Sequence, residues 1–284
     1  MTSADAPIEI EDSGSGPCIL LLPGSFSTAA AWRPLRRLLE PRYRVIAASL
    51  PGYGGSAERR GQSRTGIAPF YPFIRQLAGI AGTAVHLVGH SFGASVALAG
   101  ALSGEIEVAS LTLVEAIPLH LLQGRSGGRK AAGYIAEIRS VHAEYAGAFA
   151  RGDKDAARLV IDMWSGAGTF DALAEPVRDY ARRTVAVNLR DWESAWDFAP
   201  GARQLAAFSG PGAIVHGSAS HPSISLMAGL LEAAMPGARR FSVDGASHFL
   251  PFTHAGQLAE IIERTGSLAK DRGNAGGRTS PAPR

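Results

Sequence analysis

The sequence predicts an α/β fold in which a mostly parallel central β-sheet has helices on both of its faces. Short runs rich in aliphatic and β-branched residues recur along the chain, and segments with helical periodicity lie between them. The later runs are almost continuously apolar, which is typical of strands that are buried on both faces of a parallel sheet. Regular alternation of strands and helices favours an open sheet that is covered on both sides.

Each predicted helix connects two strands of this sheet or follows the last strand. The first strand is short, and we expect it to add antiparallel at an edge of the sheet. The predicted strands are 8–11, 18–22, 43–49, 84–89, 110–115, 213–217 and 240–243, and the predicted helices are 29–40, 65–81, 91–102, 223–235 and 254–264.

One long segment breaks the alternation. Residues 117–208 contain no convincing strand, whereas stretches such as "GYIAEIRSVHAEYAGAFARG" have helical periodicity. A helical insertion of this size in an α/β sheet is typical of a cap over the ligand-binding end of the strands. We therefore predict a core made of residues 1–116 and 209–267, with 117–208 as a helical cap. Residues 268–284 are rich in Gly, Pro, Arg and Ser and are predicted to be a disordered tail.

The composition limits the classes of function. With 46% apolar and 19% charged residues over 284 positions, the chain can bury a sizeable core, as soluble enzymes do. Its net charge of +3 comes without a cluster of Lys and Arg interleaved with aromatic residues, so we expect no nucleic-acid partner. No apolar run is long enough to span a membrane, and the N-terminus lacks the pattern of a signal peptide, so we expect a cytoplasmic protein without a membrane partner. The oligomeric state is left open.

The stretch "HLVGHSFGAS" places a serine where a buried strand turns sharply into a helix. Gly89 and Gly93 flank Ser91, and a side chain at either glycine would clash in such a turn. The turn lifts the hydroxyl of Ser91 above the sheet and sets it at a helix N-terminus, whose dipole stabilises developing negative charge. Together, these features predict that Ser91 is a catalytic nucleophile.

Four segments resemble the α/β-hydrolase fold superfamily, in the form that has a serine nucleophile and a helical cap. They are, in the expected order, "ILLLPGSFSTAAAW", "YRVIAASLPGYGGS", the turn around Ser91, and "DGASHFLPF". The resemblance extends over residues 8–266 and implies a serine hydrolase with a nucleophile–acid–histidine order along the chain.

The resemblance implies that His248, in "GASHFLPF", is the catalytic base. A neutral imidazole, with an ordinary pKa of about 6.5, can take the serine proton and return it to the leaving group. His90 occupies the variable position of the turn, and its ring is expected to point away from the nucleophile. His254 opens a helix, and His86 and His216 lie in predicted strands, where structural roles are expected.

The acid is harder to place, because the segment "AIVHGSASHPSIS" has no carboxylate where most relatives carry one. Glu115 ends the next strand after the nucleophile helix, as the acid does in some haloalkane dehalogenases. We prefer Glu115, because catalytic groups collect at the C-terminal ends of parallel strands. Asp244, four residues before His248, is the alternative, and a Ser–His dyad without an acid is a third possibility.

The oxyanion hole of this superfamily is made by two backbone N–H groups. The resemblance implies that Phe92 supplies one and that Ser25, or alternatively Phe26, supplies the other. Here the chain departs from the family, because Pro23-Gly24 stands where a His-Gly pair is usual. The hydrogen bonds that the histidine makes must therefore be replaced or lost. Phe26 and Trp164 are expected to line the substrate pocket; further aromatic candidates are Phe170, Trp192, Trp196 and Phe198.

These residues predict acyl transfer through a serine ester. Haloalkane dehalogenases and epoxide hydrolases of this fold use an aspartate nucleophile, so their chemistry is not expected. We predict a hydrolase that cleaves a carboxylic ester or lactone of a small, mostly apolar substrate. A carbon–carbon bond hydrolase, a perhydrolase and a non-catalytic ligand-binding homologue are the alternatives. We expect no cofactor and no metal, because the sequence has no dinucleotide-binding glycine motif, no P-loop and no paired histidines on a helix.

Overall fold

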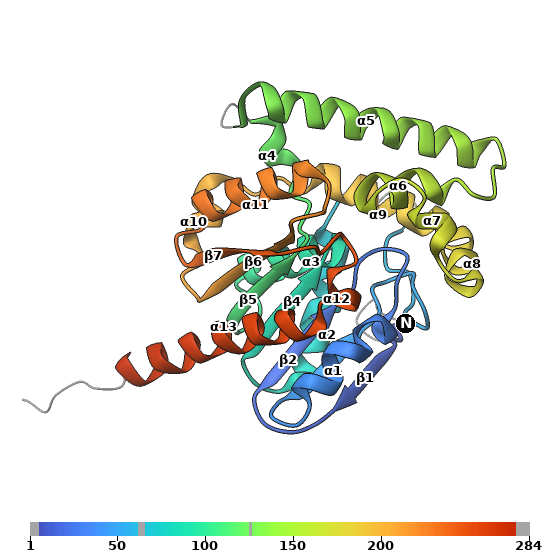
Figure 1. Ribbon diagram of the computed structural model, residues 1–284. Coiled ribbons are helices and arrows are strands. Elements are labelled where there is room, and N and C mark those ends of the chain that lie inside the picture. Colours follow the sequence, from blue (N-terminus) through green and yellow to red (C-terminus); the bar gives the residue numbers. More distant parts are fainter. Residues whose placement is uncertain (1–5, 62–65, 125–126, 277–284) are drawn as a thin grey trace, which may run out of the picture.

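A seven-stranded sheet runs through the computed structural model of the protein, which describes residues 6–61, 66–124 and 127–276 (Figure 1). β1 pairs antiparallel with β3, and the other neighbouring strands pair in parallel, which confirms the predicted α/β fold and the antiparallel edge strand. The strand order across the sheet is β1 (Ile10–Ser13), β3 (Arg44–Ala48), β2 (Cys18–Leu22), β4 (Val85–His90), β5 (Val108–Val114), β6 (Gly212–Gly217) and β7 (Ala238–Val243).

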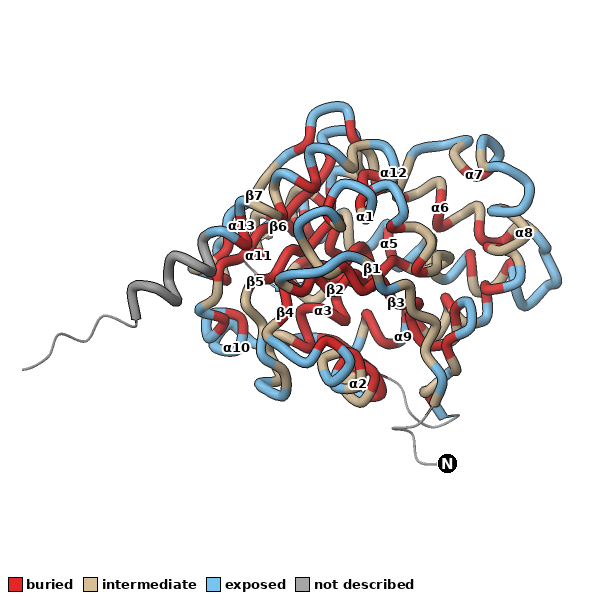
Figure 2. Tube along the Cα trace, turned by 90° about the horizontal axis from the view of Figure 1, so that it is seen from below, coloured by how far each residue is buried: buried red, intermediate tan, exposed pale blue. Residues whose placement is uncertain are grey.

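Two apolar clusters cover the two faces of the sheet, because successive side chains of a strand point to opposite faces. On β2, Ile19 and Leu21 belong to one cluster, and Leu20 and Leu22 belong to the other. The central strands β2 and β4 are accordingly buried along the trace in Figure 2. The first cluster packs against η2 (Ala29–Trp32), α1 (Arg33–Leu39), α12 (Leu250–Thr253) and α13 (Ala255–Gly276).

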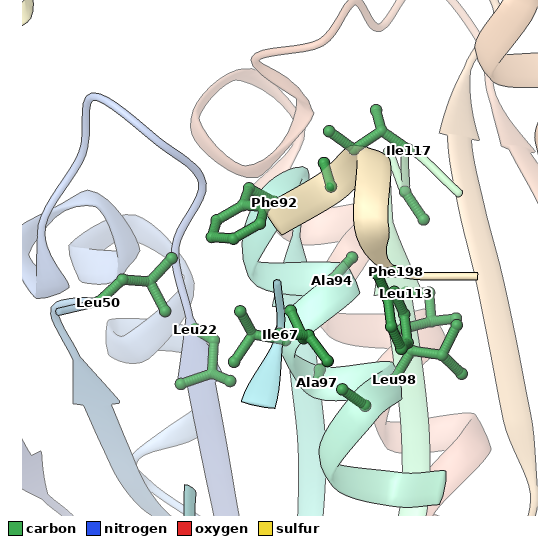
Figure 3. Packing of buried hydrophobic residues seen from close by; sticks show 14 of the residues in the cluster. Leu22, Leu50, Ile67, Phe92, Ala94, Ala97, Leu98, Leu113, Ile117 and Phe198 are labelled. Atoms are coloured by element: carbon green, nitrogen blue, oxygen red, sulfur yellow. The ribbon is translucent and has the colours of Figure 1, made fainter. Parts of the chain in front are cut away.

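The opposite face packs against the helix that follows Ser91 and against its neighbours. Figure 3 shows part of this cluster, including Phe92 and Ala94 from that helix, Leu113 from β5 and Phe198. Both sheet faces are therefore covered by helices, as the alternating pattern predicted. The helices on this face are α2 (Tyr71–Ala81), preceded by the short η3 (Ala68–Phe70), α3 (Phe92–Ser103) and α11 (Pro222–Ala234).

Between β5 and β6, the described residues form seven α-helices and no strand. Figure 1 shows α5 along the top of the view and α6 to α9 below its right-hand end, beside and above the upper part of the sheet. The division of the chain into a core and a cap stays a prediction. The seven helices are α4 (Leu119–Gln123), α5 (Gly128–Ala150), α6 (Ala157–Ser165), α7 (Thr169–Ala172), α8 (Glu175–Arg183), α9 (Val185–Asp197) and α10 (Ala202–Ala207).

The predicted boundaries differ from the observed ones most at the ends of the chain and at the start of the helix predicted over 65–81, where η3 begins at Ala68 and α2 at Tyr71. β1 begins at Ile10 rather than at residue 8, because its register with β3 starts at the pair Ile10 and Ala48. The predicted tail starts at residue 268, but α13 continues to Gly276, and residues 277–284 lie outside the described part. Within the described part of the chain, no helix is both long and apolar enough to cross a membrane.

Candidate active site

Ser91 lies in the sharp turn between β4 and α3, with φ 52° and ψ −121°. A positive φ is strained for a residue with a side chain, and it turns the chain abruptly out of the strand. A Cβ atom at Gly89 would overlap the backbone of Gly93 and Ala94, and one at Gly93 would overlap the backbone carbonyl groups of Leu22 and Pro23. The two glycines are therefore required by close backbone approach, for the reason that the sequence predicted.

The three predicted catalytic side chains, Ser91, His248 and Glu115, form one hydrogen-bonded series. Nε2 of His248 lies 3.0 Å from Oγ of Ser91, and Nδ1 of His248 lies 2.9 Å from Oε2 of Glu115. Because a carboxylate only accepts, Nδ1 carries the proton, and Nε2 of the neutral ring is left free to accept the proton of Ser91. All three residues are buried.

Glu115 directly follows β5 and is held by the loop that follows β6. Its Oε1 accepts hydrogen bonds from the backbone N–H of Gly217 at 2.6 Å and from the hydroxyl of Ser220 at 2.8 Å. The loop in which the sequence shows no carboxylate thus supplies donors to a carboxylate from the neighbouring strand. Asp244, the alternative acid, is exposed and accepts a hydrogen bond from Ser218. The geometry therefore favours Glu115.

His90 forms a hydrogen bond to the backbone of His248, a contact that the sequence did not predict. Its Nε2 donates to the backbone carbonyl of His248 at 2.9 Å, and its ring centroid lies 5.0 Å from that of His248. Burial, with a smaller effect of the neighbouring His248, lowers the pKa of His90 to about 3. His90 therefore stays neutral at physiological pH. Two other histidines bond outside the site: His86 of β4 to Ser110 of the neighbouring strand β5, and His254 to the adjacent Thr253.

The predicted oxyanion loop lies directly against the Ser91 turn. A Cβ atom at Gly24 would stand 3.0 Å from both Nδ1 of His90 and Cβ of Ser91. Phe26 has a φ of 59°, so the loop makes a sharp turn immediately after Ser25. The predicted donors Ser25 and Phe92 both line the cavity into which Ser91 opens.

This cavity has a volume of about 470 Å³ and a largely apolar lining. Trp164 stacks on His248, with ring centroids 5.8 Å apart and an interplanar angle of 24°. Phe26 and Trp164 both line the cavity, as predicted, and so does Trp192. Phe170 is instead buried in the apolar cluster that packs against α3, where Phe198 also lies. Other residues of the lining are Ile117, Val160, Ile161, Leu173, Ala181, Phe249 and Phe252.

Asp191 of α9 lines the same cavity and was not anticipated from the sequence. Its carboxylate accepts a hydrogen bond from the hydroxyl of Ser25 at 2.6 Å. The surrounding stretch "DWESAWDF" indicates only aromatic candidates for the pocket, because an acidic residue on an amphipathic helix ordinarily faces solvent. Among the described residues, no group of three or more His, Cys, Asp or Glu side chains is arranged to hold a metal ion.

The chain belongs to the α/β hydrolase family: the family model described as "Alpha/beta hydrolase family" matches residues 19–261. This range includes the Ser91 turn, Glu115 and His248. Enzymes named as esterases, dehalogenases and other hydrolases are found among its relatives, which supports a hydrolase.

Two curated relatives illustrate the similarity in sequence. The chain is 33% identical over 122 residues to a fluoroacetate dehalogenase of a Burkholderia species, which is 42% of this chain and 40% of that one. It is 31% identical over 112 residues to a pimeloyl-[acyl-carrier protein] methyl ester esterase of Aeromonas salmonicida, which is 39% of this chain and 42% of that one. The matches thus span about two fifths of the length of these relatives.

A solved structure supports the fold over nearly the whole chain. The crystal structure of an α/β hydrolase from Sphaerobacter thermophilus is similar with a TM-score of 0.68 and 23% identity. The similarity covers 90% of this chain and 96% of that one. At this level of identity, the likeness concerns the fold alone.

Proposed function

We propose that this hydrolase cleaves a carboxylic ester or lactone through an acyl-enzyme, with Ser91, His248 and Glu115 as its catalytic triad. The observation that carries the proposal is the hydrogen-bonded series in which Ser91 bonds to His248 at 3.0 Å and His248 to Glu115 at 2.9 Å. The series ends at a strained, buried serine that opens into an apolar cavity. Strain at a functional side chain and a prealigned base are features of activated nucleophiles.

In the acylation step, Oγ of Ser91 attacks the carbonyl carbon while Nε2 of His248 takes the serine proton. The negative charge that develops on the carbonyl oxygen is stabilised by the backbone N–H groups of Ser25 and Phe92. Glu115 keeps Nδ1 protonated and stabilises the imidazolium. When the tetrahedral intermediate collapses, the alkoxide leaves with the proton from His248, and the acyl group stays on Ser91.

Deacylation repeats these steps with water. His248 takes a proton from a water molecule, whose oxygen attacks the acyl carbon and forms a second tetrahedral intermediate in the same oxyanion hole. Collapse of this intermediate releases the carboxylic acid and returns the proton to Oγ of Ser91. No bound metal or cofactor is needed to balance the reaction.

The cavity supports a small, mostly apolar substrate. Its volume of about 470 Å³ is within the usual range for small-molecule sites. Apolar side chains from the segment 117–208, such as Val160, Ile161 and Trp164, form one wall, and the Ser91 turn forms another. Ser91 supplies a hydroxyl rather than a carboxylate, which does not favour the carbon–halogen chemistry in the name of one relative.

The test combines covalent labelling with turnover. We expect the wild-type protein to hydrolyse short-chain nitrophenyl esters and to lose this activity when one equivalent of a serine-directed phosphonate reacts with Ser91. Ser91→Ala should not be labelled, and both Ser91→Ala and His248→Ala should lose hydrolysis while they keep the wild-type melting temperature within a few degrees. Full turnover by Ser91→Ala would contradict the proposal. A folded wild-type protein that neither reacts with the phosphonate nor turns over would support the ligand-binding alternative.

A further inference from the structure

Asp191, on α9, is a buried carboxylate that joins three segments of the chain. Its Oδ2 accepts hydrogen bonds from the hydroxyl groups of Ser25 at 2.6 Å and Tyr53 at 2.5 Å. Its Oδ1 accepts one from the guanidinium of Arg60 at 2.6 Å. The side chains of Asp191 and Arg60 are only 3% and 1% exposed. Ser25 follows β2, whereas Tyr53 and Arg60 follow β3.

Burial disfavours the charged forms of both Asp191 and Arg60, and the attraction between the two charges opposes this effect. Burial raises the pKa of Asp191, although Arg60 and the two hydroxyl donors act against this rise. Burial disfavours the charge on Arg60, but the carboxylates of Asp191 and Glu58 outweigh it and raise its pKa. A buried ion pair of this kind often adds little net stability compared with apolar residues of the same shape. The ion pair of Asp191 and Arg60 is therefore better explained by the positions that it fixes than by a gain in stability.

The geometry points to the oxyanion loop. Asp191 holds the side chain of Ser25, and the backbone N–H of the same residue is the donor assigned to the oxyanion in the proposed mechanism. The next residue, Phe26, has a positive φ, and the preceding Gly24 lies against Ser91, so both neighbours of Ser25 are held in restricted conformations. The histidine that usually precedes this glycine is replaced by Pro23, which has no N–H and no polar side chain.

We propose that Asp191 is a positioning residue for the oxyanion hole. Its carboxylate, held by Arg60 and Tyr53, anchors the hydroxyl of Ser25 and so keeps the Ser25 N–H aimed at the carbonyl oxygen of the substrate. The inference rests on the proposed acyl-transfer function. Asp191 lies on α9, one of the helices between β5 and β6. The proposed role therefore means that the packing of these helices helps to position the Ser25 loop that follows β2.

The decisive variants are Ser25→Ala and Asp191→Asn. Ser25→Ala keeps the backbone N–H and leaves the pair of Asp191 and Arg60 intact, so it removes only the proposed anchor. We expect kcat for a short-chain nitrophenyl ester to fall about tenfold to a hundredfold in both variants, with KM changed less than about threefold. The double variant should be no slower than Asp191→Asn alone, because both changes break the same connection.

Asp162→Asn is the matched control. Asp162 lies on α6, does not line the cavity, and accepts hydrogen bonds from the backbone N–H groups of Gly168 and Phe170. We expect this variant to lower the melting temperature without lowering kcat. The comparison separates loss of stability in these helices from loss of oxyanion geometry.

The outcomes separate the two proposals. An active wild-type protein whose Ser25→Ala variant keeps kcat within about twofold would overturn the positioning role and leave the proposed function standing. The same holds if the two single variants change only KM or the melting temperature. If Asp191→Asn does not fold because Arg60 loses its partner, Ser25→Ala decides alone. A wild-type protein without turnover and without phosphonate labelling of Ser91 would overturn the proposed function, and the positioning role with it.

Discussion

At the scale of single residues, Glu115 and Asp244 show how the surroundings of a side chain decide its role. Both are carboxylates near predicted strand ends, and the sequence left both open as the acid. Glu115 is fully buried and receives two hydrogen bonds on one oxygen, while its other oxygen lies 2.9 Å from His248. Asp244 is exposed and bonds to Ser218, whose hydroxyl also accepts from the N–H of Gly245. A buried, fully bonded carboxylate can hold the histidine in one tautomer, whereas an exposed one has water as a competitor.

This difference predicts unequal effects of two matched substitutions. Glu115→Gln replaces an acceptor oxygen with a donor and should favour the wrong tautomer of His248, so we expect kcat for ester hydrolysis to fall by about 10³- to 10⁴-fold. Asp244→Asn should change kcat less than about threefold. Steady-state kinetics of both folded variants makes the comparison. A large loss in Asp244→Asn together with a mild one in Glu115→Gln would move the acid to Asp244.

At the scale of elements, close backbone contacts hold the junction of β4 and α3 in place. The backbone N–H of Ser91 donates to the carbonyl of Val114 at 2.9 Å, which ties the turn to the end of β5. Gly93 lies against the backbone of Leu22 and Pro23, at the end of β2. The turn is thus clamped between its two neighbouring strands, and this rigidity sustains the strained conformation of Ser91.

A pair of glycine substitutions in helices tests this clamp. Gly93→Ala puts a methyl group into the backbone of Pro23, so we expect a loss of several kcal/mol in unfolding free energy, as overpacked sites show. Gly79→Ala, in α2, meets no atom within 4 Å and should gain up to about 1 kcal/mol from helix propensity. Denaturant unfolding of both variants measures the difference. Equal stability of the two variants would show that the junction can relax.

At the scale of the whole molecule, the cavity is enclosed by segments that are far apart in the sequence. Ser91 directly follows β4, and His248 lies in the loop after β7. Trp164 and Trp192 come from α6 and α9, between β5 and β6. The two tryptophan rings stack on each other with centroids 6.2 Å apart, and Trp164 also stacks on His248. Under the proposed function, the size of the acyl or alcohol group that fits the cavity is therefore set by how these helices pack over the sheet.

Removal of one wall should change substrate preference. We expect Trp164→Ala to raise kcat/KM for octanoyl relative to acetyl nitrophenyl ester by about tenfold, because the shortened side chain makes room for further methylene groups. The ratio of the two kcat/KM values is the measurement, and Phe170→Leu, which changes a buried aromatic residue outside the cavity lining, is the control. An unchanged ratio would mean that the longer chain extends in another direction.

Much of this organisation follows from local sequence. The seven strands, the antiparallel edge and the turn at Ser91 could be predicted, because periodicity and steric limits on glycine act over a few neighbouring residues. The pairing of Ser91 with His248, 157 positions apart, was implied only by the family resemblance. The contact of His248 with Glu115 rather than with Asp244 depends on tertiary packing, since Glu115 and His248 lie 133 positions apart. The same is true of Asp191, which meets Ser25 across 166 positions. The partner of a buried polar group is whichever distant segment packs beside it, and that choice has no local signature in the sequence.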